Sequence, residues 1–253
     1  GAPMPTKLPI CVEMSSPGDA GPSPVRAWGQ GMKLRIRFLD GARPLQAKVV
    51  TAAVEWLKYA NLGFVFGDDL DAQIRITFAD GALWSYIGTD ARFVPKELPT
   101  LSLGALTTRT NPETLRRIVL HMFGHVLGMT HEHQNPTSST PWNLAKLYAY
   151  FAAAPYNWSQ LQVYANFLTR YASSLTNTGT FDPQSIMLAP IPDPLTVGDF
   201  AVGWNKGLSQ TDMAWAAMWY PRGTHSAAPD EAPPDKMDGE TQDAPPDDAA
   251  AGV

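Results

Sequence analysis

Polar and apolar residues alternate in two short segments of the N-terminal half, Lys33–Leu39 and Gln73–Phe78. This alternation is typical of a β-strand with one buried face. The short apolar segments 64–66 and 98–106 predict two further strands, the second at an edge of the sheet. The intervening segment 81–92 has no clear period, and we expect a loop there.

Apolar residues recur at helical spacing in several segments. One helix is expected to open at Pro44 and to end before Gly63. Another starts after the capping residue Asn111 and stops at Gly128. Three later helices are expected in 141–152, in 159–172 and from the cap Ser209–Asp212 to Pro221. Strands with one helix come first and helices follow, which predicts an α+β fold of two lobes with a mixed sheet.

Composition divides the chain into three parts. Residues 1–25 are rich in Pro and Gly and predict an irregular N-terminal arm, followed by a folded domain over 26–222. From Asp230 onward there are eight acidic residues and one lysine, which gives this segment a charge of −7. Residues 223–253 are therefore predicted to form a disordered acidic tail. Since the chain carries −5, the rest is near neutral, which excludes the electrostatic footprint of a nucleic-acid-binding protein.

The remaining composition narrows the class of protein. Hydrophobic residues make up 44% of the chain, which predicts a packed core. No apolar run reaches the roughly 20 residues that span a bilayer, so we expect a soluble protein without a membrane partner. The only cysteine, Cys11, excludes an intramolecular disulfide and is expected to be a buried or inert thiol. The sequence leaves the cellular compartment open. One cysteine is compatible with a reducing compartment and also with export or secretion of the natural parent protein.

Three of the five histidines form an HxxxHxxGxxH pattern. On a helix, His121 and His125 lie about 40° apart around the axis, one turn from each other. Gly128 permits a sharp turn that brings back His131 as a third nitrogen ligand. Three nitrogens and one open position are typical of a catalytic zinc site, so we expect one Zn²⁺ per chain. His133 is expected on the rim of this site and His225 in the solvated tail.

The segment HMFGHVLGMTHEHQNP, His121 to Pro136, resembles the signature of the metzincin zinc peptidases, especially the astacin-like group. Ser185-Ile186-Met187 is similar to the Met-turn of that group. The resemblance covers 26–221 and implies a two-lobed domain with zinc at the floor of a peptide-binding cleft. It also implies that His121, His125 and His131 are ligands and that Met187 lies beneath them without binding the metal.

Two positions depart from the family pattern, and both affect the chemistry. The family has a Glu general base where this chain has Met122, and a thioether cannot shuttle a proton. The family's Met-turn tyrosine is replaced by Ala189. Losing a general base costs roughly 10²–10⁴ in rate, so proteolysis is expected to be weak or absent. Glu132 is a candidate replacement base, although the family uses that position structurally, and Glu113 serves only the helix dipole.

Both replacements are apolar, so Met122, Leu188 and Ala189 are predicted to line one apolar pocket beside the metal. In such a pocket, zinc can act as a Lewis acid or a hydroxide source on a small carbonyl substrate. Two alternatives stay open: a zinc endopeptidase with residual activity, and a non-catalytic zinc protein that binds a peptide or a partner. The retained ligands fit both a natural pseudoenzyme and an engineered catalyst.

Overall fold

A computed structural model of the chain describes residues 10–14, 26–171 and 180–222. All of these belong to one compact unit. The predicted acidic tail, His225 included, lies outside the described residues. None of the described helices has the length and apolar character needed to cross a membrane.

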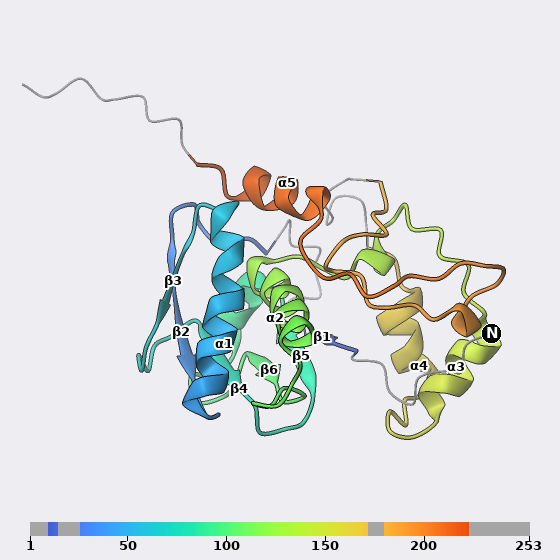
Figure 1. Cartoon of the computed structure of the whole chain (residues 1–253), viewed down its shortest axis with the longest axis horizontal. Coiled ribbons are helices and arrows are strands. Elements are labelled where there is room, and N and C mark those ends of the chain that lie inside the picture. The colour runs from blue at the N-terminus through green and yellow to red at the C-terminus, as the bar shows by residue number, and fades with distance from the viewer. Residues whose placement is uncertain (1–9, 15–25, 172–179, 223–253) are drawn as a thin grey trace, which may run out of the picture. The chain divides into compact units, whose positions relative to one another are not determined.

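A six-stranded mixed sheet forms one half of the domain (Figure 1). Its spatial order is β1-β5-β6-β4-β2-β3. The strands comprise β1 Val12–Met14, β2 Lys33–Phe38, β3 Gly63–Phe66, β4 Ile74–Thr77, β5 Leu83–Tyr86 and β6 Leu101–Leu103. β5 runs antiparallel to β6, whereas the other neighbouring pairs are parallel. The expected α+β class with a mixed sheet is therefore confirmed.

Three expectations for this sheet were wrong. Within the expected loop 81–92, Leu83–Tyr86 forms β5 and Gly88–Phe93 forms a 3-10 helix. β6 is not an edge strand, because β5 and β4 flank it. The arm is not irregular throughout, since Val12–Met14 pairs in parallel with β5. In each case pairing with a distant segment decides the structure, and a few residues carry too little periodicity to show it.

The two N-terminal helices pack against each other and supply much of the core. α1 spans Arg43–Ala53, with Pro44 in its first turn, and a 3-10 helix continues it over Val54–Lys58. α2 spans Pro112–Leu127. Asn111 caps α2 by accepting from the backbone N–H groups of Glu113 and Thr114, and Gly128 ends it in the left-handed conformation, as the sequence predicts.

Shorter helices form the C-terminal half, where Figure 1 shows α3 and α4 away from the sheet. The α-helices of this half are α3 Leu144–Ala152, α4 Gln160–Val163 and α5 Gln210–Trp219. A π-helical turn, Tyr164–Leu168, extends α4, and 3-10 turns occur at Glu132–Gln134 and Asp193–Leu195. Ser209 and Asp212 form the expected capping box at α5.

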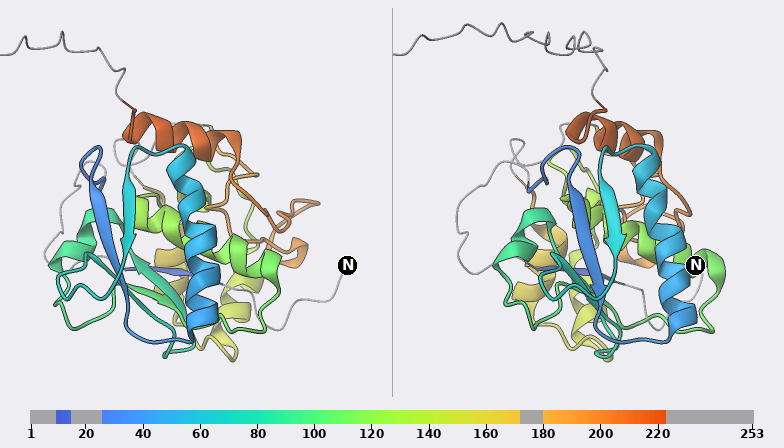
Figure 2. Two further views of the ribbon diagram at one scale, coloured as in Figure 1. Left: turned by 60° about the vertical axis from the view of Figure 1, so that its left-hand side comes forward. Right: turned by 90° about the vertical axis from the view of Figure 1, so that its left-hand side faces the viewer.

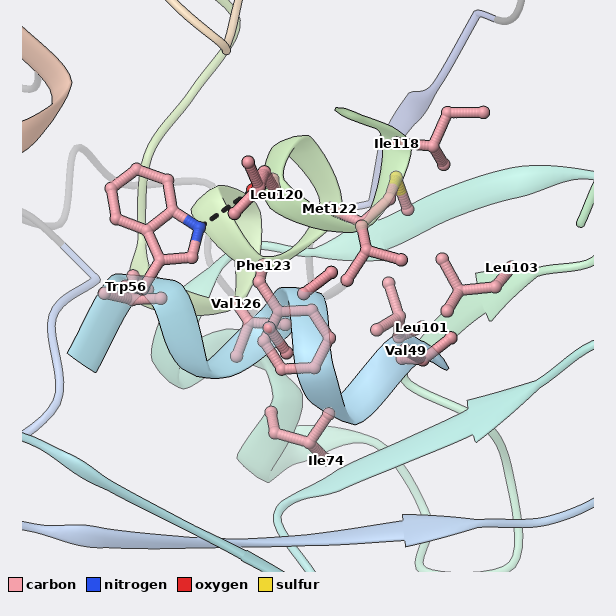
Figure 3. Close-up of a cluster of buried hydrophobic side chains, with 14 of the residues drawn as sticks. Val49, Trp56, Ile74, Leu101, Leu103, Ile118, Leu120, Met122, Phe123 and Val126 are labelled. Atoms are coloured by element: carbon pink, nitrogen blue, oxygen red, sulfur yellow. Dashed lines mark hydrogen bonds between the residues drawn. The ribbon is translucent and has the colours of Figure 1, made fainter. Parts of the chain in front are cut away.

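The main hydrophobic core lies between α1, α2 and the inner strands (Figures 2 and 3). Trp56, fully buried, donates its indole N–H to the carbonyl oxygen of Leu120 at 2.9 Å. A second cluster around Leu147, Phe151 and Phe167 stabilises the C-terminal half. From Arg117 to Leu127 every residue of α2 is buried in the domain, so its two histidines are held on a rigid element.

Candidate metal centre

His121 and His125 lie one turn apart on α2 with their rings fixed by backbone carbonyl groups. His121 Nδ1 donates to Ile186 O at 2.9 Å, and His125 Nδ1 donates to Met129 O at 2.9 Å. These bonds require a proton on each Nδ1, which leaves each Nε2 with a free lone pair. The two Nε2 atoms face each other at 3.2 Å. The carbonyl groups thus select the tautomer that a metal ligand needs.

His131 joins the pair through the turn at Gly128. Gly128 has φ of +108°, and a Cβ there would meet Arg26 O at 3.0 Å, so glycine is required on both counts. The ring centroid of His131 lies 5.3 Å from that of His121 and 4.7 Å from that of His125. All three rings are buried. The structure therefore brings together the three predicted ligands.

A fourth donor comes from the N-terminal arm. Cys11 contributes its sulfur to the three imidazoles, and the four donor atoms lie within 4.8 Å of one another. Cys11 is 4% exposed. The expected buried thiol is confirmed, but its place was not predicted: the pairing of β1 with β5 carries Cys11 to the histidines.

The donor set fits zinc. Three imidazole nitrogens and one sulfur are a tetrahedral zinc set, and Zn–N bonds of about 2.0–2.1 Å place neighbouring nitrogens roughly 3.3 Å apart. The 3.2 Å separation of His121 Nε2 and His125 Nε2 matches that spacing. Burial lowers the pKa of His125 to about 4 and keeps the pKa of His121 and His131 well below the usual value. The rings are thus neutral, as ligands must be.

A buried cation lies beside this centre. Arg117, one turn before His121 on α2, donates from its guanidinium group to Leu188 O at 2.6 Å and stacks on Trp204 at 4.6 Å. Burial lowers the pKa of Arg117 to about 10, so it keeps its charge at neutral pH. Burial raises the pKa of the Cys11 thiol, and Arg117 acts in the opposite direction by favouring the thiolate.

The predicted Met-turn lies directly against the histidine helix. Ile186 supplies the carbonyl oxygen that holds His121, and Met187 is fully buried. A Cβ at Gly124, between the two helical histidines, would overlap the sulfur of Met187. Asp212 of α5 fixes the turn by accepting from Ser185 Oγ and from Ile186 N, each at 2.7 Å.

Replacing Asp212 with asparagine is expected to destabilise the fold by about 3 kcal/mol, because a charged acceptor of several hydrogen bonds is lost in a buried site. The amide oxygen can keep the bonds from the N–H groups of Ile186 and Ser209, which share one oxygen, but the NH₂ group then faces Ser185 Oγ, whose hydroxyl loses its acceptor. Urea unfolding measures the change. Exposed Asp199→Asn is the matched control, and an equally small effect at both positions would contradict the structural role of Asp212.

The apolar positions near the metal divide between two clusters. Met122 is fully buried in the main core, which also contains Ile118 and Leu103 (Figure 3). Leu188 packs with Ile191 and Val202 in a separate cluster. Ala189 is 7% exposed. The single pocket that the sequence predicts for Met122, Leu188 and Ala189 therefore stays a prediction, since two of its walls belong to different clusters here.

The remaining candidates have structural contacts. Glu132 accepts from Asn135 Nδ2 at 3.0 Å and from Asp182 N at 2.9 Å, both at Oε1, and it is not part of the group of four metal-donor residues. Glu113 pairs with Lys206 on the surface. His133 is buried rather than on a rim: it stacks between His131 and Phe167 and donates to Asn166 O at 2.7 Å. The rim position was wrong because the π-helical turn, through Asn166 and Phe167, and Trp142 pack against His133.

The sequence analysis missed the residues that the arm brings to the centre. Cys11 has no ligand spacing to the histidines along the chain, and Glu13 and Tyr171 belong to no motif. Glu13 accepts from the backbone N–H of His131 and from the hydroxyl of Tyr171. The only signal available was that a single cysteine occurs in a chain with a three-histidine pattern.

A mixed sheet, a histidine helix closed by a left-handed glycine and a methionine turn beneath it define a metzincin-type metallopeptidase scaffold with a three-histidine zinc site. The chain belongs to the astacin-like group of metzincins. A structure of myroilysin is 39% identical, with a TM-score of 0.76 over 78% of this chain and 97% of that chain. A crystal structure of myroilysin is 35% identical, with a TM-score of 0.66 over 85% and 92%.

A third similar structure agrees in fold alone. High choriolytic enzyme 1, a hatching-enzyme zinc protease from the medaka fish Oryzias latipes, is 16% identical, with a TM-score of 0.53 over 76% of this chain and 94% of that chain. No family model and no curated protein sequence matched the chain.

Proposed function

We propose that the protein is a zinc-dependent, metallopeptidase-type protein whose metal is capped by its own N-terminal arm and whose peptide hydrolysis is impaired. The observation that carries this proposal is the position of Cys11 among His121, His125 and His131. Three histidines and a cysteine complete a four-coordinate site, which is the closed arrangement of zinc sites without an open position. The arm must release Cys11 before a substrate can take its place.

The scaffold positions the ligands but lacks the residues for proton transfer. Bound zinc supplies a Lewis acid that polarises an oxygen atom or lowers the pKa of a water molecule. Met122, at the position of the family's Glu, can neither accept nor return a proton. Ala189 offers no hydroxyl group to a developing oxyanion. Amide cleavage needs both functions, so it loses more than a reaction that needs only carbonyl activation.

We therefore favour a small carbonyl compound as the substrate class of the uncapped form. Ala189 lacks the phenol ring that the family has at this position, so we expect room for a ligand beside the histidines, and the apolar residues Met122 and Leu188 favour an apolar one. In surroundings of low dielectric constant, a zinc ion held by the three histidines would attract a carbonyl oxygen more strongly than it does in water.

A second candidate function is binding without catalysis, and one observation favours it. β1 pairs in parallel with β5 in the register Val12↔Trp84, Glu13↔Ser85 and Met14↔Tyr86. The edge of β5 thus accepts an extended peptide by backbone hydrogen bonding, a common mode of peptide recognition. A peptide from a partner could replace the arm at this edge.

In a Cys11→Ala background, a small apolar ketone is expected to bind more tightly than a capped tetrapeptide, and only when zinc is present. Ala189→Tyr should weaken ketone binding about tenfold or more, because the ring fills the space beside the ligands. Calorimetric titration of the zinc-loaded and zinc-free proteins measures both affinities. Exposed Ala201→Tyr is the control. Equal ketone affinity with and without zinc would reject the Lewis-acid proposal and leave the binding function.

A further inference from the structure

The carboxylate of Glu13 is enclosed by hydrogen-bond donors next to the metal centre. Its Oε1 atom accepts from the backbone N–H of His131 at 2.6 Å, and its Oε2 atom accepts from the hydroxyl of Tyr171. Nδ1 of His131 lies 3.1 Å from Oε1. The Glu13 side chain is only 10% exposed. Both oxygens of one carboxylate are therefore recognised in a nearly closed space.

The strand geometry explains why this carboxylate and the capping sulfur point the same way. Successive side chains of a β-strand point to opposite faces, so Cys11 and Glu13, two positions apart, share a face. The register opposite Ser85 then places this face toward the histidines. The arm thus makes two side-chain contacts beside the metal centre. Cys11 contacts the three histidine ligands, and Glu13 accepts hydrogen bonds from the His131 N–H and the Tyr171 hydroxyl.

The two hydrogen-bond donors, the backbone N–H of His131 and the hydroxyl of Tyr171, belong to the body of the domain and not to the arm. The backbone of His131 follows the turn at Gly128, and the backbone N–H of Tyr171 donates to Gln134 O at 3.0 Å. Burial and the Glu13 carboxylate raise the pKa of Tyr171, so that its hydroxyl stays a donor, while the charge of Arg26 acts in the opposite direction. When the arm leaves, two hydrogen-bond donors lose their protein acceptor, and the acceptor oxygens of a ligand can take its place.

We infer that the His131 N–H and the Tyr171 hydroxyl form a carboxylate-binding subsite that accepts the acidic side chain of a peptide after the arm has left. The inference rests on the proposed function in one respect, that the arm is a removable cap. An anion with two oxygens satisfies both donors at once, and charge-assisted bonds are roughly twice as strong as neutral ones. An amide of the same shape can accept from the His131 N–H and donate to the Tyr171 oxygen, but neither bond is charge-assisted.

The first test uses acetate and acetamide as matched probes. Glu13→Ala leaves a space for a two-carbon molecule while Cys11 keeps its place at the metal. Acetate is expected to bind this variant at least about tenfold more tightly than acetamide, because only the anion makes both bonds in charge-assisted form. The readout is the chemical shift of the His131 backbone amide proton, titrated at constant ionic strength. The parent protein should respond to neither probe, since Glu13 fills the subsite.

Three results would overturn the subsite: equal affinity for the two probes, an acetate response in the parent, or an unchanged preference after Tyr171→Phe is added to Glu13→Ala. Binding of acetate at the metal would survive Tyr171→Phe and raise the reactivity of Cys11 toward a thiol reagent. Zinc content is measured in every variant. Missing zinc would count against the proposed function, whereas zinc retained without an acetate preference rejects only the subsite.

The second test addresses peptides directly. In the Cys11→Ala/Glu13→Ala protein, both side-chain anchors of the arm are removed. N-acetyl-glutamate N-methylamide should then bind about tenfold more tightly than N-acetyl-glutamine N-methylamide, for the reason given for acetate. Adding Tyr171→Phe should remove most of this preference. Equal binding of the two compounds would restrict the subsite to Glu13 of the arm and reject its use by peptide ligands.

Discussion

The Cys11→Ala/Met122→Glu double variant should cleave peptides at least about 100-fold faster than the parent, since a general base contributes roughly 10²–10⁴ in rate. Cys11→Ala alone opens the ligand position but supplies no base. Met122→Glu alone supplies a base beside a capped metal. Each single variant should therefore remain slow, and the gain should exceed the sum of the two single effects. Peptide cleavage at equal zinc loading measures all four proteins.

The matched control for the base is Met122→Gln in the Cys11→Ala background, because glutamine has nearly the shape of glutamate and transfers no proton. Met122 is fully buried, so the folded state of each variant is checked by thermal unfolding. A gain from glutamine equal to that from glutamate would exclude base catalysis. If Cys11→Ala alone is as fast as the double variant, another base exists, and Glu132 becomes the first candidate. Full family activity is not expected, because Ala189 still lacks the phenol.

Replacing His121 and His125 together with alanine is expected to reduce bound zinc from about one ion per chain to almost none. Loss of an outer hydrogen-bond partner of a ligand already costs about 10–100-fold in metal affinity, and two direct ligands contribute more than that. Since metal binding stabilises the folded form, the unfolding temperature should fall as well. Metal analysis after dialysis measures the zinc content.

His133→Ala is the matched control for the ligand pair. His133 is as buried as the ligands and stacks on His131, but it donates to Asn166 O and lies outside the group of four donors. The His133→Ala variant should keep its zinc but lose some stability, because the packing against Phe167 is lost. Zinc retained at one ion per chain in the His121→Ala/His125→Ala variant would place the metal elsewhere.

The arm connects these predictions. Its few described residues supply the sulfur that closes the ligand set, the carboxylate that fills the subsite at His131, and a strand that covers the edge of β5. Release of the arm would therefore change three properties together: the open position at the metal, the acceptor for two buried donors, and the accessibility of the sheet edge. The thiol of Cys11, the only cysteine, offers a direct chemical report of that release.

The sequence by itself determined the features that depend on neighbouring residues. Asn111 and Gly128 define the ends of α2 because capping and left-handed backbone are local effects. The spacing of His121 and His125 places both rings on one face of that helix, and the turn at Gly128 brings His131 to them. The capping box of Ser209 and Asp212 is local in the same way.

The tertiary structure alone decided what comes from distant segments. Cys11 and Glu13 reach the histidines because β1 pairs with β5, and backbone pairing between short strands leaves almost no mark on either sequence. Long-range pairing with β4 and β5 places β6 inside the sheet, and packing against Phe167 of the π-helical turn buries His133. The three histidine ligands could be predicted from their spacing, whereas the fourth donor and the carboxylate beside it depend on contacts that only the folded chain creates.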